Sequence, residues 1–117
     1  MTMERPAISH PLPEELVELI AGRFRVLGEP VRIKLLDRLH EGEASVIELM
    51  EITSTTQQNV SKHLGILLRE GIVARRKSGN FSYYRIADPS VFALCEAVCG
   101  ALRHELQQRA VVLNGSV

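Results

Sequence analysis

The sequence predicts a mainly α-helical domain with one small β-hairpin, arranged as a winged helix-turn-helix. Two features of the chain of 117 residues lead to this prediction. The segment from Thr56 to Leu64 (TQQNVSKHL) has the pattern of an amphipathic helix with a polar, hydrogen-bonding outer face. The segment from Arg75 to Asn80 (RRKSGN) follows shortly and has the composition of a basic hairpin tip. A polar helix with a basic hairpin behind it is a combination that suits a DNA-binding domain.

Length and composition favour one domain in a reducing compartment. The chain has 45% hydrophobic residues, which is enough for a core, and no apolar run near the length of a membrane span. We expect the domain to occupy residues 14–113, between a flexible N-terminal arm (1–13) and a C-terminal tail (114–117). The arm has no secretory-signal pattern, so the two cysteines indicate reduced thiols and a cytoplasmic protein with no membrane partner. The four histidines have no zinc-ligand spacing, and we expect neither a metal nor a cofactor.

Apolar periodicity and helix-end signals predict the first two helices. Leucine, valine, isoleucine and phenylalanine residues recur at helical spacing over residues 14–27. Gly28 follows this segment and is typical of a left-handed helix end. A second helix begins near Pro30, because proline fits the first helical turn, and ends before Gly42.

Capping signals predict the helix-turn-helix itself. Ser45 and Glu48 have the spacing of a capping box at the start of a short third helix, which ends at Ile52. A polar break of turn length follows, and Thr56 can cap a fourth helix that runs to Glu70. A short helix, a tight turn and a second helix with a polar outer face form a helix-turn-helix.

A hairpin and a long helix complete the predicted fold. Residues 72–76 and 81–86 are short β-like runs, and residues 78–80 (SGN) supply a tight turn between them. A last helix starts at residues 88–90 (DPS) and reaches about Leu113. The expected order is therefore four helices, two strands and a final helix.

Positive charge is concentrated in the middle of the chain although the formal net charge is zero. Residues 56–86 contain six basic residues and one acidic residue, a net charge of +5. Residues 1–55 carry −4 and residues 87–117 carry −1. The middle segment fits a nucleic-acid-binding face, although a solvated face that balances the acidic ends explains the same distribution.

The fourth helix and the hairpin supply the candidate DNA contacts. Val60 and Leu64 point inward, so Gln58, Asn59 and Lys62 point outward at about 100° per residue. Such side chains can bond to base edges, and basic residues on a hairpin can reach phosphates or a minor groove. The predicted DNA-binding residues are Thr56, Gln57, Gln58, Asn59, Ser61, Lys62 and His63 on the helix and Arg75, Arg76, Lys77 and Asn80 on the hairpin. Alternatively, these polar residues only keep an exposed helix soluble.

Three segments resemble the ArsR/SmtB family of winged-helix repressors. They are LGEPVRIKLLDRL, TTQQNVSKHLGILLREGIV and RRKSGNFSYYRI. The residues that match the family's patterns are Gly28, Glu29, Pro30 and Arg32; Thr56, Gln57, Ser61, His63 and Leu64; and Arg76, Gly79 and Tyr84. The resemblance covers roughly residues 15–105, with a slightly longer spacing at the hairpin tip. It implies a homodimer that represses its promoter until an effector releases it.

His63 and the pair of outer helices each admit a structural and a functional interpretation. The ring of His63 falls nearer the buried side of its helix, which favours a role in fixing the helix over a DNA contact. The first and last helices carry apolar residues beyond what the DNA-reading module needs, and this excess, together with the homodimer that the resemblance implies, favours a homodimer through these two helices. They could instead complete the core of a single protomer. A two-fold dimer would read double-stranded DNA as an inverted-repeat operator.

Metal sites of the kind known in the resembled family are doubtful in this chain. One such site is a Cys-x-Cys at the start of the third helix, where this chain has Ser45 and Ile47. The other is built around the last helix, and the matching positions are Asp88, Ser90, Ala101 and His104. Only the first and last of these four are ligands, which is too few for a closed transition-metal site.

The last helix also carries Cys95 and Cys99, four residues apart on one face. They suit a dithiol oxidation switch, a persulfide sensor or soft-metal capture. The position of Cys95 on the predicted buried stripe favours the alternative, in which both are small core residues.

The leading hypothesis is a sequence-specific DNA-binding transcriptional regulator, a repressor that an effector releases. The alternative is a winged-helix protein-interaction module without DNA binding, for which the +5 segment has no use. An enzyme is not expected, because neither cysteine has a general base near it in the sequence pattern and no phosphate-binding glycine loop occurs.

Overall fold

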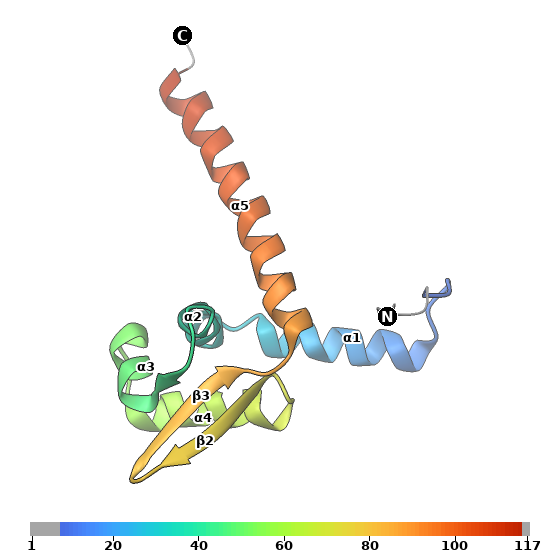
Figure 1. The fold of residues 1–117 in the computed structure, drawn as a ribbon. Coiled ribbons are helices and arrows are strands. Elements are labelled where there is room, and N and C mark those ends of the chain that lie inside the picture. Colours follow the sequence, from blue (N-terminus) through green and yellow to red (C-terminus); the bar gives the residue numbers. More distant parts are fainter. Residues whose placement is uncertain (1–7, 116–117) are drawn as a thin grey trace, which may run out of the picture.

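A computed structural model describes residues 8–115 and has the predicted winged helix-turn-helix arrangement (Figure 1). The elements are α1 (Glu14–Leu27), α2 (Pro30–Leu39), β1 (Ala44–Ser45), α3 (Val46–Thr53), α4 (Gln57–Arg69), β2 (Val73–Ser78), β3 (Phe81–Ile86) and α5 (Pro89–Gly115). The predicted helices and hairpin are confirmed, and α5 runs two residues beyond its predicted end. Residues 1–7 of the predicted arm and residues 116–117 of the predicted tail lie outside the described residues.

The sheet has a third strand that the sequence analysis missed. Strand β1 pairs antiparallel with β3 through Ala44↔Tyr84 and Ser45↔Tyr83, which gives the order β1-β3-β2. A strand of two residues is too short to produce an alternating pattern. In addition, Ser45 is the N-cap of α3, so its capping signal hid its role in the sheet.

The core lies between α2, α3, α4 and the inner face of the sheet. Its largest fully buried side chains are Leu35, Leu36, Leu49, Val60, Leu64, Leu67 and Ile72. Val60, Leu64 and Leu67 are spaced at i, i+4 and i+7, so one face of α4 is fixed in the core and the opposite face is left to solvent.

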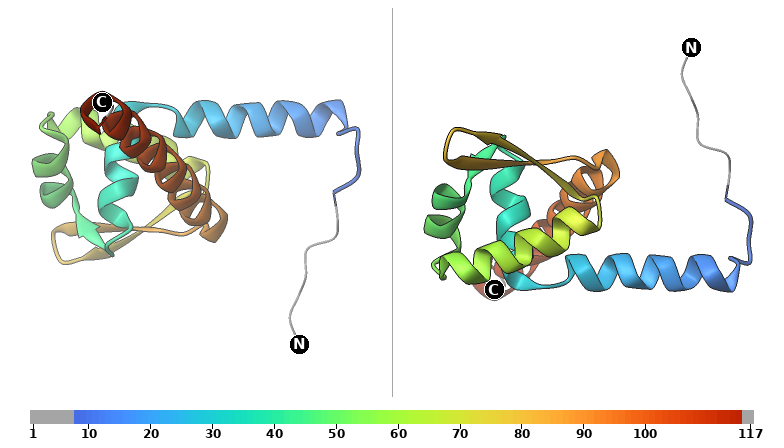
Figure 2. Two further views of the ribbon diagram at one scale, coloured as in Figure 1. Left: turned by 90° about the horizontal axis from the view of Figure 1, so that it is seen from above. Right: turned by 90° about the horizontal axis from the view of Figure 1, so that it is seen from below.

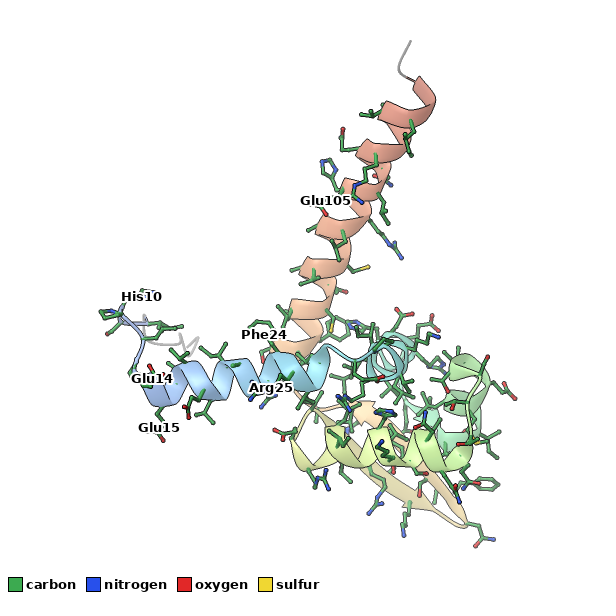
Figure 3. The ribbon with its side chains drawn as sticks, turned by 180° about the vertical axis from the view of Figure 1, so that it is seen from behind. His10, Glu14, Glu15, Phe24, Arg25 and Glu105 are labelled. Atoms are coloured by element: carbon green, nitrogen blue, oxygen red, sulfur yellow. The ribbon has the colours of Figure 1, made fainter. Side chains whose placement is uncertain are left out.

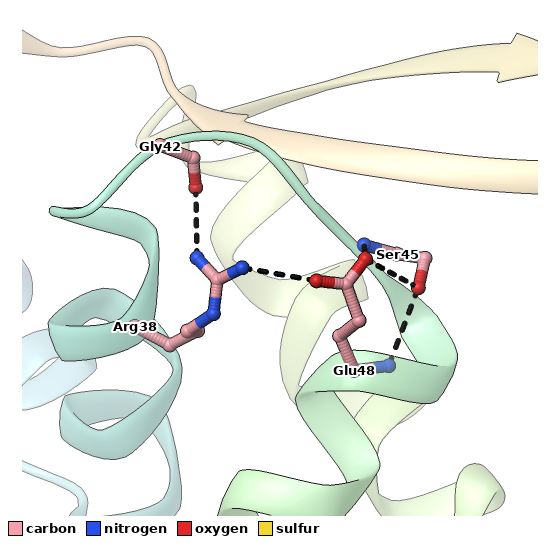
Figure 4. Close-up of polar contacts among 4 residues, drawn as sticks. All are labelled: Arg38, Gly42, Ser45 and Glu48. Atoms are coloured by element: carbon pink, nitrogen blue, oxygen red, sulfur yellow. Dashed lines mark hydrogen bonds and ion pairs between the residues drawn. The ribbon is translucent and has the colours of Figure 1, made fainter.

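Two N-caps fix where the helices of the helix-turn-helix begin. The amide of Glu48 donates to Ser45 Oγ at 3.2 Å and the amide of Ser45 donates to Glu48 Oε1 at 3.3 Å, which confirms the predicted capping box (Figure 4). Thr56 Oγ1 accepts the amide of Asn59 at 3.1 Å and caps α4 as predicted. Each cap stabilises its helix by about 1 kcal/mol.

Gly28 ends α1, but not by the left-handed conformation that the sequence suggested. Its φ is −85°, and its amide donates to the carbonyl oxygen of Phe24 at 2.9 Å. A Cβ at this position would lie 3.0 Å from that oxygen. Close approach to the last turn, rather than a positive φ, is therefore the reason for glycine.

Helices α1 and α5 project from the domain in different directions (Figures 1 and 2). The radius of gyration is 17.6 Å, compared with about 13 Å for a compact chain of this length. On α1 only Leu27 is buried, and Phe24, near the base of α5 in Figure 3, is 54% exposed. On α5 every residue from Glu96 to Leu113 is exposed. Leu27 of α1 and Val91 of α5 belong to the core, but most of the apolar face of each helix lies outside the core of this protomer.

Candidate nucleic-acid interface

Helix α4 presents a row of polar side chains to solvent. Gln57, Gln58, Ser61 and Lys62 are all exposed, as the helical periodicity predicted. The row begins at the N-terminus of the helix, where backbone N–H groups and the helix dipole favour a phosphate. Amide, hydroxyl and ammonium groups along one exposed helix face can bond to base edges in a major groove.

Asn59 differs from its neighbours. It is half-buried, and its Nδ2 donates to Thr55 Oγ1 at 3.1 Å. The sequence placed this side chain outward, whereas the structure turns it back onto the turn before α4. Thr56 is similarly engaged, because its hydroxyl caps the helix. Both residues shape the start of α4, and their predicted contacts with DNA stay predictions.

The three basic hairpin residues that were predicted to bind DNA, all on β2, do not share one face of the sheet. Arg75 pairs with Tyr84, which is buried, and Arg76 pairs with Tyr83. Residues directly opposite on antiparallel strands project to the same side, and successive residues alternate. Arg75 and Lys77 therefore project from the face of the sheet that packs on the core, and Arg76 projects from the other face. Alternation along β2 separates Arg76 from Arg75 and Lys77, and the pairing of Arg75 with buried Tyr84 shows which face packs on the core.

Arg76 is already engaged within the protein. Its Nε and Nη2 donate to Glu43 Oε2 and Oε1 at 2.8 and 2.7 Å, a bidentate ion pair. Its guanidinium carbon also lies 4.7 Å from the centre of the Tyr83 ring. The hydrogen bonds from Arg76 lower the pKa of the Glu43 carboxyl below its ordinary value, so Glu43 stays ionised at neutral pH.

His63 is buried and takes part in a polar network with α2. It is 7% exposed, and its Nδ1 accepts a hydrogen bond from Arg32 Nη1 at 3.1 Å, since arginine has no acceptor. Arg32 Nε donates to the carbonyl oxygen of Val26 at 2.6 Å, and the Arg32 amide donates to Glu29 Oε2 at 3.0 Å. Arg32 thus joins the end of α1 to the middle of α4.

The network favours the structural interpretation of His63. Burial lowers the pKa of its imidazole below the ordinary value; the Glu29 carboxylate, 3.7 Å away, opposes this shift and the Arg32 guanidinium adds to it. The ring is therefore neutral at neutral pH. A buried, neutral histidine that accepts from Arg32 positions α4 and does not present a charge to DNA.

Comparison with known proteins identifies the family. A family model described as a helix-turn-helix domain matches residues 27–76. The uncharacterized HTH-type transcriptional regulator Rv0081 of Mycobacterium tuberculosis is 38% identical over 102 residues, 86% of this chain and 90% of that protein. The HTH-type transcriptional repressor SmtB of the same organism is 36% identical over 85 residues, 73% of this chain and 63% of that protein. This chain belongs to the ArsR/SmtB family of transcriptional regulators.

Solved structures of ArsR/SmtB-type proteins share the fold. The crystal structure of Rv0081 has a TM-score of 0.75 at 36% identity, and the match covers 84% of this chain and 99% of that chain. The homodimeric winged helix-turn-helix domain of Mb0332 from Mycobacterium bovis has a TM-score of 0.73 at 26% identity, covering 86% of this chain and 95% of that chain. The neighbours confirm the predicted fold class and the family resemblance.

Three positions of the family's metal sites, Ser45, Asp88 and Ser90, have structural roles in this ArsR/SmtB protein. Ser45 caps α3. Asp88 accepts the Ser90 amide at 2.9 Å and hydroxyl at 2.6 Å, and it also pairs with Arg23 at 3.2 Å. No group of three or more histidine, cysteine, aspartate or glutamate side chains gathers as a metal site within residues 8–115.

The two cysteines of α5 differ in their surroundings. Cys95 is half-buried, and burial together with the neighbouring Cys99 raises the pKa of its thiol. Cys99 is exposed, so the interpretation of both as core residues does not hold for Cys99 within this protomer.

Among the helices of the described chain, none has the length and apolar character needed to cross a membrane.

Proposed function

We propose that this protein is a cytoplasmic, sequence-specific DNA-binding repressor that acts as a homodimer and releases its operator when an effector binds. The observation that carries the proposal is the exposed polar row of α4, held in place by its buried face and by its caps. Arg75 and Lys77 supply basic groups beside it on the hairpin. Family membership supports the same conclusion, because the matched relatives are transcriptional regulators.

The exposed apolar faces support the homodimer. Large hydrophobic side chains exposed on the two projecting helices are Leu16, Val17, Leu19, Ile20 and Phe24 on α1 and Val98, Leu102, Leu106, Val111, Val112 and Leu113 on α5. Many large apolar side chains exposed along one helix mark a surface that binds another protein. Pairing through α1 and α5 places two α4 helices in one symmetric particle, which fits an operator with inverted-repeat half-sites. The Mb0332 domain, a structural neighbour, is a homodimer.

Fluorescence anisotropy with DNA from upstream of the protein's own gene tests this proposal. Lys62→Ala should weaken binding to every sequence and lower the slope of log K against log salt by about one. Gln58→Ala should instead relax sequence preference by about 1–3 kcal/mol per lost base contact. The charge-matched control is Lys34→Ala on the exposed side of α2. Equal losses for Lys34→Ala and Lys62→Ala, or a monomer that ignores duplex DNA in dilute buffer, would contradict the proposal.

The effector we propose is thiol-reactive and acts at Cys95 and Cys99. Cβ atoms four residues apart on a helix are about 5–6 Å apart, whereas a disulfide needs about 3.5–4.5 Å. An intrahelical disulfide would therefore distort α5, and a soft metal ion or metalloid that bridges two thiolates fits the spacing better. Within the protomer, Cys99 is exposed and Cys95 is half-buried.

The double variant Cys95→Ser/Cys99→Ser tests the effector separately from DNA binding. It should bind the operator like the wild type but fail to release it with arsenite, mercuric ion, persulfide or oxidant. Release of the double variant by the same agents at the same concentrations would rule this site out. Comparing arsenite with a mild oxidant on the wild type distinguishes capture of a bridging ion from disulfide formation.

A further inference from the structure

An ion pair crosses the whole sheet of the wing. Glu43 directly precedes β1, Arg76 lies on β2, and β3 lies between these two strands. The carboxylate of Glu43 therefore reaches over the central strand, where the Arg76 guanidinium rests on the Tyr83 ring. The bidentate geometry and the aromatic contact leave Arg76 with one favoured position.

The segment that carries Glu43 is fixed to the helix-turn-helix on both sides. Before it, the carbonyl oxygen of Gly42 accepts a hydrogen bond from Arg38 Nη1 at 3.3 Å, and Arg38 Nη2 donates to Glu48 Oε2 at 3.0 Å (Figure 4). After it, Ser45 caps α3. The carboxylate of Glu43 is thus anchored to the module that contains α4, and its partner is anchored to the hairpin.

We propose that Glu43 is a positioning residue for DNA binding. It holds Arg76 on the face of the sheet that points away from the core and so fixes the wing relative to α4. In this orientation, the wing presents Arg75 and Lys77 to the phosphates. Arg76 then acts through Glu43 and makes no phosphate contact of its own. This inference rests on the proposed function, because it assigns a role within the same DNA interface.

The sign of one substitution separates this role from simple electrostatics. Removing a negative charge near a DNA-binding surface should by itself strengthen binding to a polyanion. If Glu43 only masked Arg76, Glu43→Gln would also free a guanidinium for phosphate, and the salt slope would steepen by about one. Positioning predicts the opposite: the neutral variant loosens the wing and weakens binding. Charge alone cannot explain why neutralising an acidic residue would weaken DNA binding.

The experiment measures operator binding over a range of salt for wild type, Glu43→Gln, Arg76→Gln and the double variant. Glu41→Gln is the matched control, because Glu41 is exposed two residues away and has no ion pair among the described residues. We expect Glu43→Gln to weaken binding about three- to fivefold, the upper range for an exposed ion pair, with an unchanged salt slope. Arg76→Gln should cause the same loss, and the double variant no further loss. Glu41→Gln should bind as tightly as wild type or slightly more tightly.

Two results overturn the proposal while leaving the DNA-binding function intact. One is a Glu43→Gln variant that binds as tightly as wild type or more tightly. The other is an Arg76→Gln variant whose salt slope falls by about one, which would assign Arg76 to a phosphate. Failure of the proposed function looks different, because the wild type itself then shows no operator binding. Unfolding midpoints of all variants, measured by circular dichroism, identify any variant whose loss comes from misfolding.

Discussion

Replacing Arg32 by lysine tests whether one side chain joins helix α1 to helix α4. The substitution keeps the positive charge, and it keeps the hydrogen bond from the residue 32 amide to Glu29, which belongs to the backbone. It removes the planar fork that reaches the Val26 carbonyl and His63 Nδ1 at the same time. A lysine ammonium can satisfy one of these acceptors and leaves the other unpaired.

The expected loss follows from the environment of the acceptors. His63 is 7% exposed, so water does not readily replace the lost donor. Leaving a buried acceptor unpaired costs about 1–3 kcal/mol. We therefore expect Arg32→Lys to lower the free energy of unfolding by about 1–3 kcal/mol. For a domain of ordinary stability, about 5–15 kcal/mol, this loss is large enough to measure.

Urea unfolding followed by circular dichroism, at one fixed protomer concentration, measures this loss, since the stability of a dimer depends on concentration. Arg69→Lys is the matched control, because Arg69 is exposed at the end of α4, and its effect should stay within about 0.5 kcal/mol. The double variant Arg32→Lys/His63→Gln should lose less than the sum of the single variants. If Arg32→Lys unfolds with the same midpoint as Arg69→Lys, Arg32 does not hold the network together.

Three further predictions concern His63, the dimer and the cap of α3. Because burial lowers the pKa of His63 in the folded state, its contribution to stability is complete above the unfolded pKa of about 6.5 and is lost as pH falls toward the folded value. In a pH series of urea titrations, the unfolding free energy should change by at most about 1.4 kcal/mol per pH unit from this group, and the change should disappear in His63→Gln. Phe24→Ser should weaken the dimer about a hundredfold to ten-thousandfold in sedimentation experiments, because two side chains each worth about 1.5–3 kcal/mol leave the interface. Ile47→Ser on α3, which is equally exposed, should leave the dimer unchanged. Ser45→Ala removes the acceptor of the Glu48 amide and should lower the unfolding free energy by about 1 kcal/mol at neutral pH, and no change would mean that β1 pairing alone fixes this segment.

Helix positions that are determined by residues close together in the sequence could be predicted. The extent of α1 follows from its apolar spacing, and the starts of α3 and α4 follow from the caps Ser45 and Thr56, because an N-cap lies next to the first turn that it caps. The exposed row of α4 was predictable for the same reason. Helical periodicity fixes which side chains point outward once the buried face is known.

Contacts between distant segments could not be predicted in this way. The pair Glu43–Arg76 spans 33 positions and the pair Arg32–His63 spans 31, and nothing in either local pattern names the partner. Which face of the hairpin packs on the core depends on the register of β2 and β3, and a shift by one residue would reverse it. The apolar stripe of α1 was found, but its periodicity is the same whether it packs in a protomer core or against a second copy.

The family's shared residues take on a physical meaning when the two segments that contain them are brought together. Glu29 and Arg32 belong to one motif and His63 to another, and in the folded chain the three residues form one network. Arg32 bonds to the last turn of α1 at Val26 and to the centre of α4, and both bonds come from one planar group. A rotation of α1 about its C-terminal end therefore has to break one of these bonds or move α4. Because α1 carries an exposed apolar face, pairing of two copies would act on the reading helix through this same guanidinium, which is why the loss in Arg32→Lys should appear in operator affinity as well as in stability.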